Sequence, residues 1–179
     1  MAFLDPQHNI EQFKLDKGMS VADFGSGSGF YTIEASKAVG SDGRVYSIDV
    51  QKDLLERIKK SAIAEQLYNI EVIWGDIEKN GGTKLANYSV DAVILSNTLF
   101  QTEDKKELIS EIQRVLKPTG KLLLIDWSDS FGNLGPTPAM VFTEKQAEEL
   151  FISEGFVLER KIEAGDHHYG FVLRKSLVV

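Results

Sequence analysis

A short apolar strand that runs directly into three alternating glycines constrains this chain more than any other feature. Residues 21–24 are Val-Ala-Asp-Phe and residues 25–29 are Gly-Ser-Gly-Ser-Gly, so Asp23 stands two residues before the first glycine. Only glycine lets a backbone approach a ligand this closely without an intervening Cβ. A second apolar run, 44–49, also ends in an acid, Asp49. Open α/β sheets bind ligands at the carboxyl ends of their strands, and the two runs therefore predict a nucleoside-binding crevice.

Strands and helices alternate along most of the chain. The apolar spacing predicts strands over 19–24, 44–49, 70–74, 90–95 and 121–125, and helices over 30–39, 54–62, 103–116 and 143–151. This alternation is typical of a parallel sheet with right-handed crossovers. Two further β-like runs, 156–162 and 169–174, flank Gly165-Asp166 and predict a hairpin. We therefore expect an α/β, Rossmann-like, doubly wound sheet of seven strands, mostly parallel with one antiparallel strand from the C-terminal hairpin.

The length of 179 residues fits a single domain, 1–179. Residues 1–17 mix apolar side chains with Pro6, which we expect to break regular structure, and they are a candidate lid that contains one helical turn. Residues 128–142, rich in glycine and proline, are expected to form a surface loop. Trp74 and Trp127 are expected to pack in the interior, and His8 to lie on the surface or in the lid.

Composition excludes several classes of function. The chain has no cysteine, which removes disulfides, thiolate metal sites and cysteine nucleophiles, and its three histidines have no ligand spacing, so no metal is expected. A net charge of −7 disfavours binding to nucleic acid. The N-terminus lacks the pattern of a signal peptide and no apolar run is long enough to span a bilayer, so a cytoplasmic location is expected.

The glycine spacing is G-x-G-x-G, and the third glycine of a dinucleotide-binding loop is replaced by Phe30. A side chain of this size is expected to prevent the close helix–strand packing of a nicotinamide oxidoreductase. Other features accompany the glycine loop: Asp49, the run Trp-Gly-Asp at 74–76, the terminal hairpin and the run Leu-Lys-Pro-Thr-Gly-Lys-Leu at 116–122. On all of these features the chain resembles the class I S-adenosylmethionine-dependent methyltransferases over residues 18–175. Within that family it is most similar to the small ubiquinone/menaquinone-biosynthesis and arsenite groups, but arsenite chemistry needs cysteines.

The resemblance implies S-adenosylmethionine as methyl donor and a set of residues that bind it. The loop would meet the methionine part, Asp49 would accept hydrogen bonds from both ribose hydroxyls, and Asp76 would accept one from the adenine amino group. Asp23 would be a structural or ammonium-contacting acid. The full set of expected cofactor residues is Asp23, Gly25, Ser26, Gly27, Gly29, Asp49, Val50, Asp76, Ile77 and Asn97.

Two residues are candidates for catalysis. His168, at the hairpin turn, is either a base or an exposed turn residue, and Asp126, at the end of a strand, either faces the acceptor or caps the following loop. Methyl transfer needs alignment above all, and a base only when the nucleophile must lose a proton.

The acceptor side of the reaction remains open. Thr98 and Leu99 replace the two prolines of the amino-methyltransferase signature, which disfavours exocyclic amines as acceptors. A small-molecule acceptor is favoured, while a protein or RNA acceptor stays open, as do the oligomeric state and the choice of O-, N- or C-methylation. The alternatives are a non-catalytic S-adenosylmethionine-binding protein and, with less support, a nicotinamide-dependent oxidoreductase.

Overall fold

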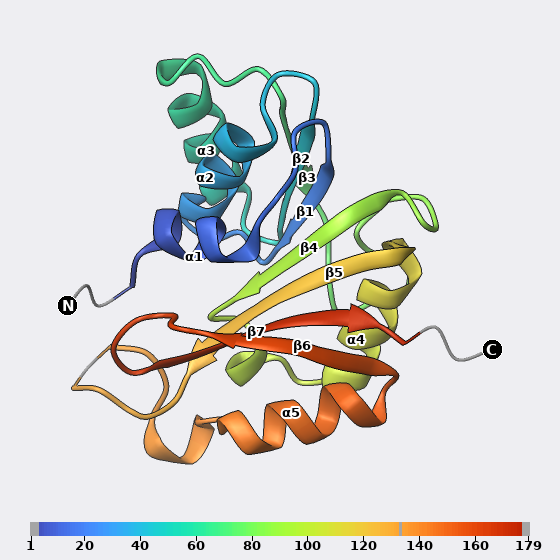
Figure 1. Ribbon diagram of the computed structural model, residues 1–179. Helices are drawn as coiled ribbons and strands as arrows, with labels where there is room; N and C mark the ends of the chain where they lie inside the picture. Colours follow the sequence, from blue (N-terminus) through green and yellow to red (C-terminus); the bar gives the residue numbers. More distant parts are fainter. Residues whose placement is uncertain (1–3, 133, 177–179) are drawn as a thin grey trace.

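A seven-stranded sheet forms the centre of the molecule, and the computed structural model describes it over residues 4–132 and 134–176. The order is β3-β2-β1-β4-β5-β7-β6, in which β7 is antiparallel to both of its neighbours and the other pairs are parallel (Figure 1). The predicted fold class is therefore confirmed. The strands are β1 (Ser20–Phe24), β2 (Arg44–Asp49), β3 (Ile70–Trp74), β4 (Val90–Ser96), β5 (Leu116–Trp127), β6 (Phe156–Ile162) and β7 (His168–Lys175).

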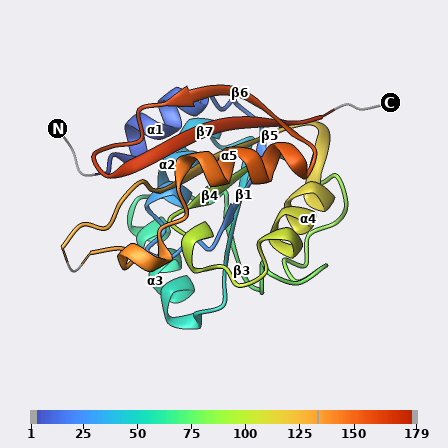
Figure 2. The same cartoon turned by 90° about the horizontal axis from the view of Figure 1, so that it is seen from below.

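Helices cover both faces of the sheet (Figures 1 and 2). They are α1 (Pro6–Phe13), α2 (Phe30–Val39), α3 (Lys52–Ala64), α4 (Lys105–Val115) and α5 (Glu144–Ser153), with short 3-10 turns η1 (Leu99–Gln101) and η2 (Pro138–Met140). None of the helices in the described ranges is long and apolar enough to cross a membrane.

The apolar run of β4 explains why two separate cores form. Its side chains alternate, so that Val93 and Leu95 join a core with α4 and α5, while Ala92 and Ile94 join a core with α1 and α2. All four are fully buried. A strand covered on both faces needs this continuous apolar sequence, and the helices that cover it must carry apolar stripes that face the sheet.

The predicted boundary between the fourth helix and the fifth strand is wrong for a local reason. Residue 116 was expected to end the fourth helix, but that helix stops at Val115 and Leu116 is the first residue of β5, where it pairs with Val90. Pro118 disfavours helical geometry in the residue before it, and the chain is therefore already extended when it reaches the proline. The capping box predicted for α5 is present, with Thr143 and Gln146 bonded to each other's backbone.

Pro6 begins a helix and does not break one. It occupies the first turn of α1, where the missing amide proton has no helical partner, and the Asp5 side chain accepts the His8 amide as N-cap. The buried Asn9 then donates to the hydroxyl of Tyr31 at 2.9 Å and to the carbonyl of Ala164 at 3.0 Å. Two turns of helix thus connect α2 to the C-terminal hairpin, where one turn was expected. The first three residues of the candidate lid, 1–3, lie outside the described residues.

Candidate functional site

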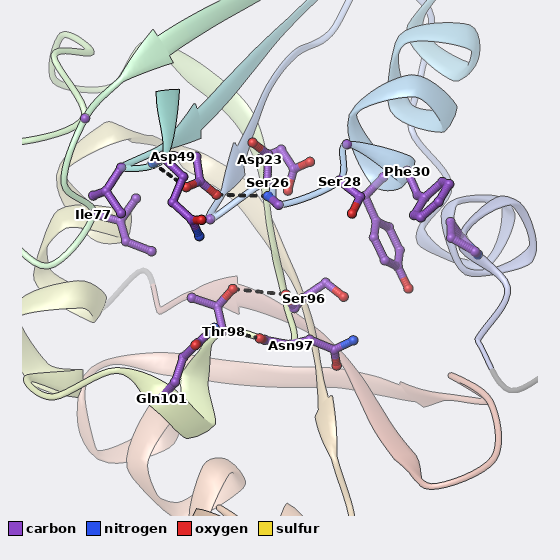
Figure 3. A pocket seen from close by; sticks show the side chains of 18 of the residues that line it. Asp23, Ser26, Ser28, Phe30, Asp49, Ile77, Ser96, Asn97, Thr98 and Gln101 are labelled. Carbon is purple, nitrogen blue, oxygen red and sulfur yellow. Dashed lines mark hydrogen bonds between the residues drawn. The ribbon is translucent and has the colours of Figure 1, made fainter. Parts of the chain in front are cut away.

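A cavity of about 480 Å³ lies at the carboxyl ends of β1, β2, β3 and β4, where the strand order reverses. This is the switch point at which open α/β sheets bind ligands. Figure 3 shows the glycine-loop residues Ser26 and Ser28 on one side, across from Ser96, Asn97 and Thr98 at the end of β4. All ten residues expected to bind the cofactor line this cavity: Asp23, Gly25, Ser26, Gly27, Gly29, Asp49, Val50, Asp76, Ile77 and Asn97.

The glycines of the loop have different neighbours. A Cβ on Gly25 would lie 2.8 Å from the hydroxyl of Thr98, and a Cβ on Gly29 would lie 2.5 Å from Cγ1 of Ile58 in α3. A Cβ on Gly27 would meet nothing closer than the Gly25 carbonyl, at 3.9 Å. Gly25 and Gly29 are therefore needed for packing, whereas Gly27 leaves space open.

The expected role of Phe30 is wrong. Its side chain is 69% exposed at the mouth of the cavity, so it does not face the sheet and cannot obstruct close packing there. The close contact between this loop and a neighbouring element is made one residue earlier, by Gly29 against Ile58. The size of residue 30 therefore gives no argument against a dinucleotide.

The charges around the cavity give that argument instead. Its charged lining residues in the described part of the chain are Asp23, Asp49, Asp76 and Glu78, and no lysine, arginine or histidine lines it. A pyrophosphate would meet like charges and no cationic partner. A ligand that carries positive charge and hydroxyl donors matches this lining.

Asp49 lies with its carboxylate between the glycine loop and the start of α3. One oxygen accepts the Gly27 amide at 2.9 Å and the other accepts the Gln51 amide at 2.8 Å (Figure 3). The side chain is held in one position, and each oxygen retains lone pairs that can accept further donors. Two adjacent hydroxyls, such as those of a ribose, fit such an acceptor.

Asp76 and Ile77 come from the loop after β3. Asp76 accepts the Glu78 amide at 3.0 Å and pairs with Lys79 at 3.0 Å. The contact with Lys79 is the main reason that the pKa of Asp76 is lowered, and it outweighs partial burial, which alone would raise the pKa. Nearby, Val50 is 57% exposed. An apolar side chain exposed in a cavity and a carboxylate at its edge suit a flat, partly polar ring.

Asp23 is buried below the glycine loop and is only 2% exposed. Burial, with a smaller contribution from the charge of Asp49, raises its pKa to about 7, although Thr32 donates its hydroxyl to the carboxylate at 2.6 Å. A group of this kind changes charge near neutral pH, and a cation bound close to it would favour the ionised form.

Two polar atoms that line the cavity region are buried and have no hydrogen-bond partner, Oγ of Ser26 and Oδ1 of Asn97. Buried polar atoms are nearly always paired in proteins, so these two atoms are candidates for hydrogen bonds to a ligand. Together with the acceptor Asp49 and the space above Gly27, they fit an adenosyl amino acid, which offers ribose hydroxyls and an ammonium group.

The two candidate catalytic residues lie outside the cavity. Asp126 is fully buried and accepts the amides of Phe100 and Trp127, so it caps the turn after β4; burial raises its pKa to about 6. His168 was described as an exposed turn residue or a base, but it is the first residue of β7. It is 9% exposed and packs against Trp127 with ring centroids 4.3 Å apart.

The desolvation that comes with burial lowers the pKa of His168. Neither residue lines the cavity. His8 is exposed, as expected. Trp127 is buried, as expected, but Trp74 is 53% exposed at the edge of the sheet, where its ring nitrogen donates to the Val50 carbonyl at 3.0 Å.

Several lining residues have no signal in the sequence. Ser96 ends β4, and Thr98 and Gln101 follow it, so their position at a strand end is the only clue that could have found them. Other lining residues come from α1, from the residue before its N-cap and from α2, and Asn9 holds the two helices together: Leu4, Pro6 and Tyr31.

Known proteins resemble this chain over most of its length. A family model described as a methyltransferase domain matches residues 15–162. A demethylmenaquinone methyltransferase of Lactococcus lactis is 28% identical over 187 residues, which cover 84% of this chain and 73% of that protein. A ubiquinone/menaquinone biosynthesis C-methyltransferase of Marinomonas is 27% identical over 124 residues, which cover 68% of this chain and 48% of that protein.

The chain spans about half the length of several such curated relatives. Among solved structures, an S-adenosylmethionine-dependent methyltransferase from Aquifex aeolicus is 30% identical, with a TM-score of 0.86. That superposition covers 96% of this chain and 89% of the other.

Proposed function

This chain belongs to the S-adenosylmethionine-dependent methyltransferase family, and we propose that its cavity binds S-adenosylmethionine and that the chain transfers the methyl group to a small molecule. The observation that carries the proposal is the lining of the cavity. Among the residues that the structure describes, four acids and no lysine, arginine or histidine line the cavity around a glycine loop with open space above Gly27. S-adenosylmethionine carries a sulfonium, an ammonium and two ribose hydroxyls, and no phosphate.

In this proposal each part of the cavity binds one part of the donor. Asp49 accepts from the ribose hydroxyls, Val50 packs on the adenine ring, and Asp76 and the Ile77 amide bind the edge of that ring. The glycine loop, with Oγ of Ser26 and Oδ1 of Asn97, surrounds the methionine part, to which Asp23 contributes negative charge from below.

The bound donor supplies an electrophilic methyl group on a sulfonium. The residues of the chain then serve to orient the acceptor and to exclude water, which is the main requirement for an in-line displacement. Because Asp126 and His168 do not line the cavity, we propose no side chain as general base. The acceptor site lies at the end of the cavity formed by Tyr31, Ser96 and Asn97, whose polar atoms are uncharged.

A small acceptor matches the segments that cover the site. Leu4 and Pro6, from the candidate lid, line the cavity, and a small molecule fits beside them. Two of the relatives are named as a demethylmenaquinone methyltransferase and a ubiquinone/menaquinone biosynthesis C-methyltransferase, and we propose a small molecule here without naming one. That residues 1–179 form one domain in the cytoplasm stays a prediction.

Transfer from tritiated S-adenosylmethionine to size-fractionated cell extract tests this proposal. We expect label in the small-molecule fraction, lost with the Asp49→Ala variant and kept with the exposed control Asp42→Ala. Label found only in the protein or RNA fraction would contradict a small acceptor. Binding of the donor without transfer to any fraction would support the non-catalytic alternative.

A further inference from the structure

The loop between β3 and β4, residues 75–89, carries the two residues that we propose to bind adenine, Asp76 and Ile77. It has no helix or strand of its own. Its backbone is closely packed instead: the Asp76 amide donates to the Gly82 carbonyl at 3.1 Å, and a Cβ on Gly82 would lie only 2.0 Å from the Asp76 carbonyl. The position of Asp76 therefore depends directly on the position of residues 79–83.

A buried carboxylate in α4 holds that second segment. Glu111 is fully buried, and its oxygens accept the Gly81 amide at 2.8 Å, the Thr83 amide at 3.2 Å and the Thr83 hydroxyl at 2.5 Å. Arg114 pairs with both oxygens at 2.7 Å and also donates to the Leu85 carbonyl at 2.8 Å. One ion pair thus bonds the loop backbone at residues 81, 83 and 85.

The charge of Glu111 is stable under ordinary conditions. Burial alone would raise its pKa, but the hydrogen bonds from Arg114 and Thr83 outweigh burial and hold the pKa at about 2. A second contact fixes the other side of the loop, since Glu78 accepts the amides of Glu103 and Asp104 at 2.9 and 3.2 Å, just before α4. Both contacts bind the loop to α4.

Removing two charges from water is costly, and a pair of this kind contributes little net stability compared with apolar packing. The hydrogen bonds from the Glu111–Arg114 pair to three loop residues instead fix the position of the loop backbone. Resting on the proposed binding of the donor, we propose that Glu111 is a positioning residue for adenine recognition, which acts through Gly82 on Asp76 and Ile77. Arg114 and Thr83, which bond to Glu111, contribute to the same positioning of the loop.

The test compares two ligands that differ only in the ring edge, S-adenosylhomocysteine and S-inosylhomocysteine. In the inosyl ligand a carbonyl replaces the amino group that faces Asp76, and a ring N–H replaces the acceptor that faces the Ile77 amide. A hydrogen bond to a charged group is worth about tenfold or more in affinity, so the wild-type chain should prefer the adenosyl ligand by at least about tenfold. Calorimetric titration measures both dissociation constants.

We expect Glu111→Gln to bring the ratio of the two dissociation constants close to one, because its amide group would face the loop amides as a donor. Thr83→Val, which keeps the ion pair, should lower the ratio less, and it decides the question if Glu111→Gln does not fold. Asp91→Asn is the matched control. This substitution removes the charge of a carboxylate that pairs with Lys117 at 2.7 Å. Asp91 lies near the start of β4 and does not line the cavity.

A purely structural role for Glu111 would weaken both ligands equally, since unfolding reduces every affinity by the same factor. A folded Glu111→Gln variant with the wild-type ratio would therefore overturn the inference and leave the proposed function intact. The same holds for an unchanged ratio in Thr83→Val if that variant alone folds. A wild-type chain that binds neither ligand would overturn the proposed function, and the inference with it.

Discussion

Replacing the buried Asp23 by asparagine should change how the stability of this protein depends on pH. Asp23 is 2% exposed, and burial raises its pKa from 3.8 to about 7. Asparagine has nearly the same shape, and its side-chain oxygen can still accept the hydroxyl of Thr32. The substitution therefore removes the titration and keeps the packing.

The magnitude follows from the two pKa values. The folded protein binds the Asp23 proton more tightly than the unfolded chain does, so the contribution of this group to stability is complete below about pH 4 and is lost as the pH rises through 7. Between about pH 5 and about pH 8 the loss amounts to about 3 kcal/mol of unfolding free energy. Asp126, whose pKa is raised to about 6, contributes in the same direction in both proteins and cancels in the comparison.

Urea unfolding at the two pH values, for the wild type and for Asp23→Asn, measures this difference directly. The wild type should lose about 3 kcal/mol more than the variant over this pH interval. The exposed control Asp42→Asn should behave as the wild type does. Equal pH dependence in the wild type and in Asp23→Asn would show that Asp23 titrates alike in the folded and unfolded chains, which contradicts a pKa raised by burial.

Three other substitutions separate binding from packing. Asp49→Ala should weaken S-adenosylhomocysteine by about 2 kcal/mol through the lost charged acceptor of the ribose hydroxyls; calorimetry with unchanged affinity would remove Asp49 from the site. Gly29→Ala should lower the unfolding free energy by about 1–3 kcal/mol, since its Cβ would lie 2.5 Å from Ile58; a double-mutant cycle with Ile58→Ala should show coupling, and additive effects would contradict the contact. His168→Ala should lower the melting temperature and leave S-adenosylhomocysteine affinity unchanged, whereas weaker binding in the folded variant would place this residue in the site.

Local patterns predict the sheet well because each strand and helix has a strong periodicity of its own. The run of β4 is apolar at almost every position, as burial on both faces requires, and Thr143 with Gln146 forms the expected capping box. The ends of the elements are less predictable. Leu116 has the apolar character of a helix residue, but pairing with Val90 and the nearby Pro118 decide its conformation.

In the cavity too, some residues can be predicted from local sequence and others depend on tertiary contacts. Its glycine loop and Asp49 stand at strand ends, and the topology alone brings strand ends together. Tertiary contacts decide the rest. Phe30 points to solvent because α2 begins there with its first residue outward, and the burial of His168 depends on Trp127, from a different strand.

The role proposed for Glu111 could not be predicted from the sequence either. Glu111 lies on the buried, apolar face of α4, and only the fold shows that the hydroxyl of Thr83, 28 residues earlier, donates to it. Spacing in the sequence gives no sign of such a contact, since it depends on how a loop without regular structure packs against a helix.

Calorimetric titration of the wild-type chain with S-adenosylmethionine, S-adenosylhomocysteine and NAD tests whether the acid-lined cavity binds the methyl donor. We expect both sulfur ligands to bind at one site per chain and NAD not to bind, because its pyrophosphate would add negative charge to a cavity lined by Asp23, Asp49, Asp76 and Glu78. Binding of NAD alone, with no heat from either sulfur ligand, would contradict this expectation.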